Sequence, residues 1–397
     1  MILELARSLH ACGSPAYELD QNMEQVATSL GKSATFFSTP TALFVTFDGE
    51  IKSTRLIRVY PCDTNLGRYA ELFDLQRSIR DDALATEDAW QRLQEINLSP
   101  NGYHAVAAIA SYGIAASCVG VLVGGNLSVA ISSGLIGLLV GMLVTGLTHL
   151  EYQTHLINVI AGFLASAVAC SVQAWIGPSH FELTTLSALI VLVPGLHLTI
   201  SINELVTQNL ASGSARLAGA MTTLLTLIFG VFMGYGFVSA LTVIPPSVAP
   251  IRPTLFLSLL VAIPIGLGLA VLFRTRYRDI PWLVISTVIG YGTMRVAGEF
   301  FSPFAAVWIA SVVAGVFSNH VSNRLQLPSA VMLMPALILL VPGSLGFSGM
   351  TKIMLNQDLP SGIRLITTMV LTAVSIVAGL LITDVLAPRT QHPTIDR

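Results

Sequence analysis

From residue 104 onward, long apolar stretches alternate with short segments that contain polar residues, glycine or proline. A helix that crosses a bilayer needs about 17–25 predominantly apolar residues. Ten stretches meet or approach this requirement: 104–124, 127–147, 155–176, 183–200, 215–242, 254–273, 281–298, 303–320, 328–344 and 363–385. The pattern therefore predicts an all-α polytopic membrane protein with ten transmembrane helices.

Residues 1–103 follow a different pattern, in which helical and strand periodicities alternate. Met1, Leu5 and Leu9 recur at helical spacing, which predicts an amphipathic helix packed on its own domain rather than a secretory signal. Further elements are predicted as helices at 17–30, 66–80 and 87–96, and as strands at 54–60 and at 35–47, the latter interrupted at Thr39-Pro40-Thr41. We therefore predict a small α/β module over 1–103, five-helix membrane repeats over 104–243 and 244–388, and a tail over 389–397.

The composition supports this division of the chain. Of its 397 residues, 53% are hydrophobic and 11% are charged, against about 25% charged residues in a typical soluble domain. Residues 1–103 hold 23 of the 42 Asp, Glu, Lys and Arg residues, whereas 104–273 hold five. So low a charge excludes disordered, coiled-coil and nucleic-acid-binding proteins, which need abundant charge or a basic face.

The Lys and Arg residues near the span ends predict the orientation in the membrane. Nine of them lie in 1–103 and three lie in 274–278, and six predicted spans separate these two regions. The connecting segments 124–126, 177–182 and 299–302 contain neither residue type. We therefore expect a multi-pass protein of the cell membrane with both termini in the cytoplasm.

An internal repeat is the most informative feature of the membrane part. The sequence ALIVLVPG at 188–195 matches ALILLVPG at 336–343, an offset of 148 residues. In both copies a polar segment, a Ser-Gly pair and an Arg follow before the next span begins. Each copy would contain five spans, an odd number, so the two copies should have opposite orientations in the membrane. Inverted repeats are typical of secondary transporters.

Several long segments resemble the threonine/serine exporter family in its fused single-chain form. They are GSPAYELDQNMEQVATSLG (13–31), STPTAL (38–43), NLGRYAELFDLQRSIRDDALATEDAWQRLQEI (65–96), VPGLHLTISINELVTQNLASGSARL (193–217) and VPGSLGFSGMTKIMLNQDLPSGIRL (341–365). The resemblance implies export of small polar amino acids driven by the proton gradient. Split two-protein relatives are associated with dicarboxylate export, which stays an alternative. Family members usually have Asp where this chain has Glu204.

The repeated Pro-Gly pairs, Pro194-Gly195 and Pro342-Gly343, should break their helices, because proline removes an N–H group and clashes with the preceding turn. Half-helix ends inside a membrane protein can hold a substrate or an ion. Glu204 follows the first break, and nearby polar residues could serve a zwitterion or a coupling proton: His197, Thr199, Ser201 and Asn203. The alternative is that the chain has left the bilayer here and Glu204 is a solvated loop charge.

Other polar residues are secondary candidates. Arg295 and Glu299 are four residues apart and predict an ion pair on one helix face. Asn319 and His320 would either face a polar vestibule or cap a helix end. Thr39 and Thr41 flank a proline that interrupts a strand, which predicts either a polar groove or an edge-strand bulge.

Two further functional classes are alternatives to the exporter. A membrane-bound hydrolase or transferase would need a site that the sequence does not display, since GxSxG, HExxH and Walker-type motifs are absent. The module over 1–103 could also be a regulatory or binding domain. We expect no cofactor or metal and no nucleic-acid partner. The expected partners are the small substrate, H⁺ and the lipid bilayer, and small-residue faces such as Gly230/Gly234 make a homo-oligomer plausible.

Overall fold

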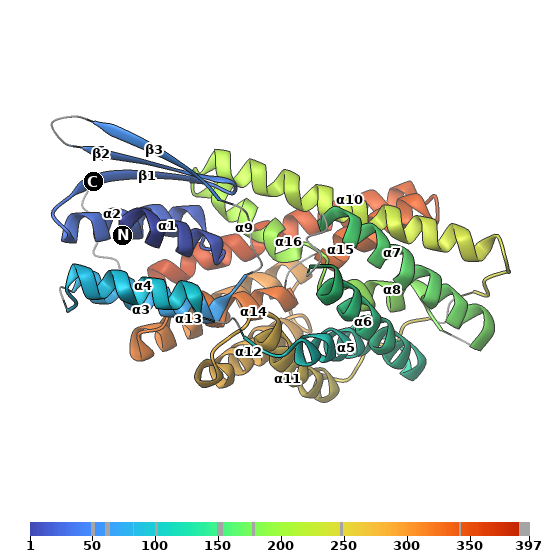
Figure 1. Cartoon of the computed structure of the whole chain (residues 1–397). Helices are drawn as coiled ribbons and strands as arrows, with labels where there is room; N and C mark the ends of the chain where they lie inside the picture. The colour runs from blue at the N-terminus through green and yellow to red at the C-terminus, as the bar shows by residue number, and fades with distance from the viewer. Residues whose placement is uncertain are drawn as a thin grey trace.

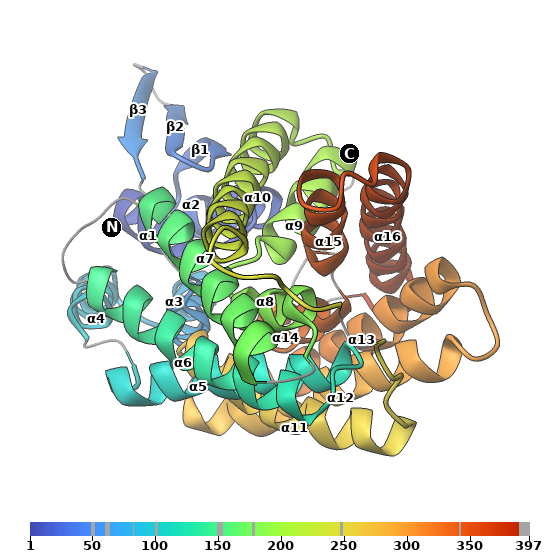
Figure 2. The same cartoon turned by 90° about the vertical axis from the view of Figure 1, so that its right-hand side faces the viewer.

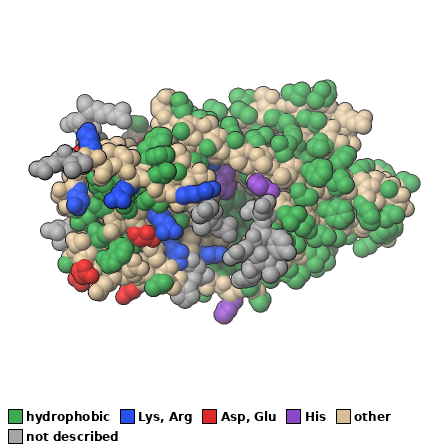
Figure 3. Space-filling model, turned by 45° about the horizontal axis from the view of Figure 1, so that its top comes forward, with side chains coloured by type: hydrophobic (Ala, Val, Ile, Leu, Met, Phe, Trp, Pro, Cys, Tyr) green, Lys and Arg blue, Asp and Glu red, His purple; other side chains and the backbone are tan. Residues whose placement is uncertain are grey.

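The structure is a computed structural model of the chain. It describes residues 1–48, 52–59, 64–81, 83–99, 102–148, 154–176, 179–246, 249–340 and 343–388. The N-terminal module lies at one end of an elongated bundle of helices (Figure 1). Charged side chains gather at this end, whereas apolar side chains dominate the rest of the face shown in Figure 3.

The N-terminal module contains four helices and a small antiparallel sheet. Its elements are α1 (Ile2–Ala11), α2 (Ala16–Ser29), β1 (Ser33–Thr39), β2 (Ala42–Asp48), β3 (Ser53–Arg58), α3 (Leu66–Arg80) and α4 (Thr86–Leu98). The strand order is β1-β2-β3. Leu5 and Leu9 of α1 are buried, so the first helix packs on its own module as its spacing predicts. The mixed α/β content predicted for this region is confirmed.

The prediction of one interrupted strand over 35–47 is wrong. The chain reverses at Pro40 and Thr41, and the resulting β1–β2 hairpin pairs Thr39 with Ala42. Proline suits such a turn because its ring fixes φ and it has no N–H to offer a strand ladder. Thr39 and Thr41 therefore lie at a hairpin turn.

The membrane part repeats one order of helices. The first copy contains α5 (Ala105–Leu122), α6 (Leu127–Thr148), α7 (Thr154–Ser171) with the π-helical turn η1 (Val172–Ile176), α8 (Phe181–Leu189), α9 (Gly195–Val206) and α10 (Leu210–Ser239). The second contains α11 (Leu255–Leu272), the 3-10 turn η2 (Tyr277–Asp279), α12 (Ile280–Ala297), α13 (Pro303–Leu325), α14 (Ala330–Leu340), α15 (Gly343–Met354) and α16 (Leu359–Leu386). Each copy thus has three long helices, a short pair and another long helix.

Nine segments of the described chain are long and apolar enough to cross a membrane, rather than the ten we predict. The segment 183–200 is not a continuous helix, because α8 ends at Leu189 and α9 begins at Gly195. The break expected at Pro194 is therefore present in the first copy. In the second copy α14 and α15 flank residues 341–342, so Pro342 lies outside the described residues.

The two copies contact one another through reciprocal pairs of helices. α8 packs on α15 and α9 packs on α14, while α10 packs on α15 and α9 packs on α16. α5 also contacts its own counterpart α11. Figure 2 shows α9 and α15 side by side between α10 and α16. At this meeting point a Cβ on Gly343 would lie 2.9 Å from the Cα of Gly195, so α15 needs glycine at its start.

The small-residue pairs that suggested self-association are used within the chain. A Cβ on Gly230 would lie 2.2 Å from the carbonyl oxygen of Val159, and one on Gly234 would lie 2.4 Å from that of Phe163. These glycines let α10 pack closely against α7. The homo-oligomer stays a prediction, but these glycine faces no longer support it.

The module packs directly onto the membrane helices. One apolar core includes Leu43 and Leu72 of the module together with Leu283 of α12 and Val331 of α14. The hydroxyl of Tyr103 donates to the carbonyl oxygen of Thr275 at 2.7 Å in the segment that joins α11 and α12. The module thus covers this end of the bundle, which we call the module end.

Candidate functional site

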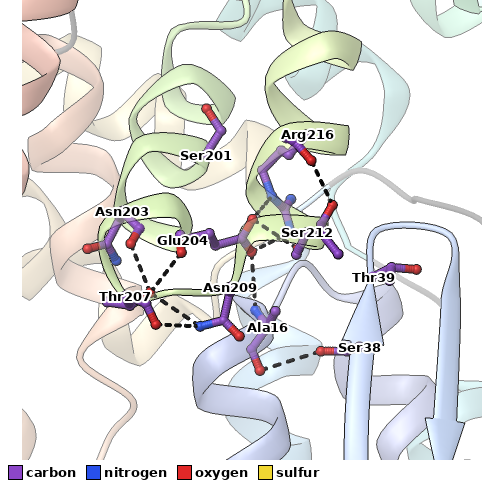
Figure 4. Close-up of polar contacts among 12 residues, drawn as sticks. Ala16, Ser38, Thr39, Ser201, Asn203, Glu204, Thr207, Asn209, Ser212 and Arg216 are labelled. Atoms are coloured by element: carbon purple, nitrogen blue, oxygen red, sulfur yellow. Dashed lines mark hydrogen bonds and ion pairs between the residues drawn. The ribbon is translucent and has the colours of Figure 1, made fainter.

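Glu204 is the centre of a buried polar cluster between α9, α10 and α2 (Figure 4). One of its carboxylate oxygens accepts from Nε of Arg216 at 3.0 Å and the other from Nη2 at 3.1 Å. The hydroxyl of Ser212 donates at 3.0 Å, and the backbone N–H of Ala16, the first residue of α2, donates at 3.2 Å. We call these four residues the junction cluster.

The turn between α9 and α10 brings Glu204 and Arg216 together. Gln208 adopts a positive φ of 66° in this turn, which reverses the chain within a few residues. A Cβ on Gly213 would lie 2.8 Å from the side chain of Leu205 and 2.9 Å from the carbonyl oxygen of Ser201. Glycine at 213 therefore permits the close approach of α9 and α10. The Ser-Gly pair of the repeat thus has a local structural role.

The charge of Glu204 is balanced within the junction cluster. Its side chain is 0% exposed and that of Arg216 is 15% exposed. A bidentate guanidinium pair is a strong form of charge-assisted hydrogen bond, and the N-terminus of α2 adds a favourable dipole. The alternative of a solvated loop charge is thus wrong. In this conformation, however, Arg216 occupies the position that a substrate ammonium group would need.

Titratable side chains of the module surround the junction cluster. Nε2 of His10 donates to the carbonyl oxygen of Thr39 at 2.7 Å, which ties α1 to the hairpin turn. Burial lowers the pKa of His10 below its usual 6.5. Burial also raises the pKa of Asp20 on α2 from 3.8 to about 6, partly offset by a hydrogen bond from the Ser38 backbone N–H. Both groups lie on the module side of the cluster.

The other residues predicted around Glu204 lie along α9. The hydroxyl of Ser201 donates to the carbonyl oxygen of Leu198 at 2.8 Å, so it serves its own helix. His197 has an exposed side chain, and Pro194 and Gly195 are buried at the start of the helix. Thr199 and Asn203 face a cavity of about 50 Å³ between α9, α14 and the first turn of α2. We call it the junction cavity.

Sequence reasoning missed the module residues of this region. Ala16 donates to Glu204, and Tyr17 and Glu18 line the junction cavity, as does Ser329 beside α14. These residues lie more than 100 positions from α9 in the chain, so no spacing connects them to it. The quoted resemblance at 13–31 covers Ala16, Tyr17 and Glu18, but it gave no reason to assign them to a site.

The secondary candidates on and near α12 and α13 lie outside the junction cluster. Arg295 and Glu299 form the predicted ion pair at 3.5 Å, and Arg252 joins Glu299 at 3.1 Å. The guanidinium of Arg295 also donates to the carbonyl oxygen of Pro253, which gives the group a structural explanation. Asn319 donates to the carbonyl oxygen of Ala387 at 2.9 Å and so caps the end of α16, and His320 has an exposed side chain.

No group of His, Cys, Asp and Glu suited to a metal ion occurs among the described residues. The junction cluster itself satisfies every polar atom of Glu204 with donors from the chain. Its chemistry is that of a buried, charge-balanced contact between α9, α10 and α2.

Comparisons with known proteins agree with this membrane architecture. The model of a family described as "putative threonine/serine exporter" matches residues 1–238, and that of "threonine/serine exporter, ThrE" matches residues 257–386. A threonine/serine exporter of Corynebacterium glutamicum is 24% identical over 83% of this chain and 69% of its own length. No solved structure matches the chain significantly.

Fungal relatives are similar over most of this chain. The pheromone-regulated membrane protein 10 of Candida albicans is 24% identical over 87% of the chain, and that of Pichia sorbitophila is 21% identical over the same share. The matched part spans about a third of the length of these fungal proteins. The two family models together cover the module and both membrane repeats. The chain belongs to the threonine/serine exporter family of membrane transporters.

Proposed function

We propose that the protein exports threonine, serine or similar small polar amino acids across the cell membrane and that a proton gradient drives this export. The contact between Gly195 and Gly343 carries the proposal. These residues occupy counterpart positions at the starts of two interrupted helices. Substrates of secondary transporters bind at such interruptions, where the repeats meet.

We infer that the two copies are inverted with respect to each other. α5 begins at the module end, where Tyr103 contacts Thr275, whereas its counterpart α11 ends there with Phe273. The reciprocal contacts between the copies also favour a two-fold relation. When two copies are related by a two-fold axis, counterpart residues such as Gly195 and Gly343 can meet only near that axis. Alternating access would then be a movement of one copy against the other.

The proposed orientation places the module end and both termini in the cytoplasm. The Lys and Arg residues of the module and of 274–278 lie together at this end, as the positive-inside rule requires. An exported amino acid would enter there and pass Asn203, Thr199 and the Pro194-Gly195 break on its way to the opposite end. His197 and Glu204 stay the predicted proton-handling residues of this pathway, and Ser201, Pro342 and Gly343 its other members.

The test is transport by the purified protein in liposomes under an imposed pH gradient. We expect movement of labelled threonine or serine that a protonophore abolishes, and none of labelled succinate. Gly343→Ala should reduce transport strongly, because the new Cβ overlaps Gly195 and overpacking of this kind costs about 1–3 kcal/mol. Gly236→Ala on α10 is the matched control, since nothing lies within 4 Å of its Cβ position.

Three results would count against the proposal. Transport of succinate alone would assign the chain to the dicarboxylate alternative. If Gly343→Ala transported as fast as the wild type, the glycine contact would not be needed for transport. Failure to move any of the three compounds would refute the proposed substrate class.

A further inference from the structure

The junction cavity has a counterpart position at the opposite end of the bundle. α9 and α14 form part of its wall, and their counterparts α15 and α8 also contact each other. In Figure 1, α8 and α15 lie farther from the module than α9 and α14 do. The repeat offset of 148 residues maps the α14 residues of the cavity wall onto α8: Ala330 onto Glu182, Leu333 onto Thr185, Met334 onto Leu186 and Leu337 onto Leu189. A two-fold relation between the copies therefore places these four α8 residues opposite α15.

The contacts of Glu182 agree with this placement. The side-chain amide of Asn356, just beyond α15, donates to Glu182 at 2.9 Å, and Nζ of Lys352, in the last turn of α15, lies 3.9 Å from it. Thr185 is three residues after Glu182 and therefore shares the face of α8 that Glu182 turns toward α15. Thr184 lies on the opposite face, because each residue turns a helix by about 100°.

The hydroxyl of Thr185 has no hydrogen-bond partner among the described residues, although only 1% of the residue is exposed. Hydroxyls inside helices often bond to a carbonyl oxygen of the preceding turn, as those of Thr199 and Thr351 do. Buried polar atoms without a partner are rare. The counterpart residue, Leu333, shows that the fold accepts an apolar side chain at this position. Packing therefore does not explain the hydroxyl, and a bound ligand would give it a partner.

An aromatic ring takes the position that corresponds to the junction cavity. Phe347 on α15 is the counterpart of Thr199, which faces that cavity. Only 1% of Phe347 is exposed, and it packs in one apolar core with Leu186 and Leu189 of α8. The phenyl ring is much larger than the side chain of threonine. The counterpart position is thus filled in this conformation, and removal of the ring would leave space next to Thr185.

We propose that α8 and α15 form a second substrate site at the opposite end, where Glu182 receives the ammonium group, Lys352 the carboxylate and Thr185 the hydroxyl of the exported amino acid. This inference rests on the proposed function. The charged atoms of Lys352 and Glu182 are 3.9 Å apart, and the two side chains are 37% and 22% exposed, so a zwitterion can enter between them from water. Phe347 has to move before the substrate binds. Because Glu182 and Lys352 belong to different copies, a bound substrate joins the two copies at this end.

The first experiment measures transport in oriented liposomes for threonine and for 2-aminobutyrate, which is threonine without its hydroxyl. Thr185→Val replaces the hydroxyl by a methyl group. On the side opposite the module it should raise the half-saturating concentration of threonine about two- to tenfold, the effect of one lost neutral hydrogen bond. It should leave that of 2-aminobutyrate unchanged. Thr184→Val is the matched control, because the hydroxyl of Thr184 is equally buried and equally without a partner among the described residues, but lies on the other face of α8.

The charged pair is tested with threoninol, in which a hydroxymethyl group replaces the carboxylate of threonine. Lys352→Gln should raise the half-saturating concentration of threonine about tenfold, since a hydrogen bond between charged groups is lost. It should leave that of threoninol unchanged. Arg364→Gln is the control, because Arg364 is an exposed cation in the first turn of α16.

These comparisons separate the two proposals. If the wild type transports neither threonine nor serine, the proposed function fails. If the wild type transports threonine and both Thr185→Val and Lys352→Gln keep its half-saturating concentration, the second site is wrong and the exporter stands. Equal effects of Thr185→Val and Thr184→Val, or of Thr185→Val on threonine and on 2-aminobutyrate, would likewise overturn the second site, because they would indicate a purely structural effect.

A second measurement follows the opening of the site. Thr185→Cys, in a chain whose four native cysteines are replaced by serine, places a thiol at the site. A small methanethiosulfonate reagent on the side opposite the module should label this thiol slowly. Phe347→Ala should strongly speed the labelling, and threonine should slow it. Labelling of Thr184→Cys should respond to neither change. Labelling of Thr185→Cys that is insensitive to both Phe347→Ala and threonine would overturn the proposal.

Discussion

Loss of one partner of the Glu204–Arg216 ion pair should open the contact between the module and the membrane helices. Arg216→Met removes the guanidinium and leaves the fully buried carboxylate with only Ser212 and the N–H of Ala16 as partners. Removing one member of a buried ion pair typically costs about 3–5 kcal/mol. Glu204→Gln should cost less, about 1.5–3 kcal/mol, because Arg216 is partly exposed and can turn toward water.

The double variant distinguishes a coupled pair from two separate effects. Once Glu204 is neutral, Arg216→Met removes no counter-charge and loses only packing. We therefore expect the double variant to lie within about 1 kcal/mol of Glu204→Gln alone, which corresponds to a coupling energy of roughly 2–5 kcal/mol. The control is Arg92→Met, which breaks the exposed Arg92–Glu95 pair of α4. Such a surface pair contributes about 0–1 kcal/mol.

Hydrogen exchange followed by mass spectrometry measures directly how often the contact between the module and the membrane helices opens. The peptide to follow contains Ala16, whose N–H donates to Glu204. Because about 1.4 kcal/mol corresponds to a factor of ten in an equilibrium constant, Arg216→Met should speed exchange of this region about 100-fold or more. Glu204→Gln should speed it about 10- to 100-fold. The reasoning is refuted if Arg216→Met changes exchange no more than Arg92→Met does, or if the two single effects add in the double variant.

The remaining predictions concern pH and the opposite end of the bundle. Burial raises the pKa of Asp20 from 3.8 to about 6, so its ionisation destabilises the fold as pH rises from about 4 to 6. Asp20→Asn should therefore stabilise the module by about 1–3 kcal/mol at pH 8 and give no gain near pH 4, as thermal unfolding at both pH values would show. Burial lowers the pKa of His10 below 6.5, so the stability that neutral His10 contributes is present above pH 6.5 and lost as pH falls. Exchange near the hairpin turn should then accelerate on acidification in the wild type, and less so in His10→Gln. Lys352 is the counterpart of Glu204 and lies 3.9 Å from Glu182 in a partly exposed pair, so Lys352→Met should cost under about 1 kcal/mol in the same unfolding assay.

Periodicity predicted most elements of the fold. α3 begins and ends at the residues predicted for it, 66 and 80, because Asn65 caps the helix by accepting from the N–H of Arg68. The segment 183–200 has the hydropathy of a single span because the residues at its break, such as Ile190 and Val193, are themselves apolar. A hydropathy pattern shows the length of an apolar run but does not show an interruption within it. The Pro-Gly pair was the signal that located this interruption.

The hairpin is visible in the burial of its strands, which the sequence does not display because the outward-facing Phe37 and Phe44 are apolar as well. Phe36 and Ser38 are buried on β1, whereas Leu43 and Val45 are buried on β2. The inward positions thus change from even to odd numbers across Pro40 and Thr41. Because successive side chains of a strand point to opposite faces, a continuous strand cannot change parity in this way. The change of phase, together with the proline, indicates two strands.

The junction cluster shows why a buried carboxylate alone does not define a binding site. The sequence singled out Glu204, but its contacts depend on Arg216, which comes twelve residues later, and on Ala16, which comes 188 residues earlier. The turn at Gln208 and the close approach at Gly213 create the first contact, and the docking of the whole module creates the second. Neither follows from the local pattern around Glu204.

The shared apolar core makes the module an integral part of the fold rather than an attached domain. Leu43 and Leu72 of the module pack in the same core as Leu283 and Val331 of the membrane helices. Close-packed interiors transmit small displacements instead of absorbing them. A displacement of α9 therefore has to move α2, which Ala16 links to Glu204, and it has to change the width of the junction cavity. The width of the junction cavity and the position of the first interrupted helix are thus coupled through the same contact.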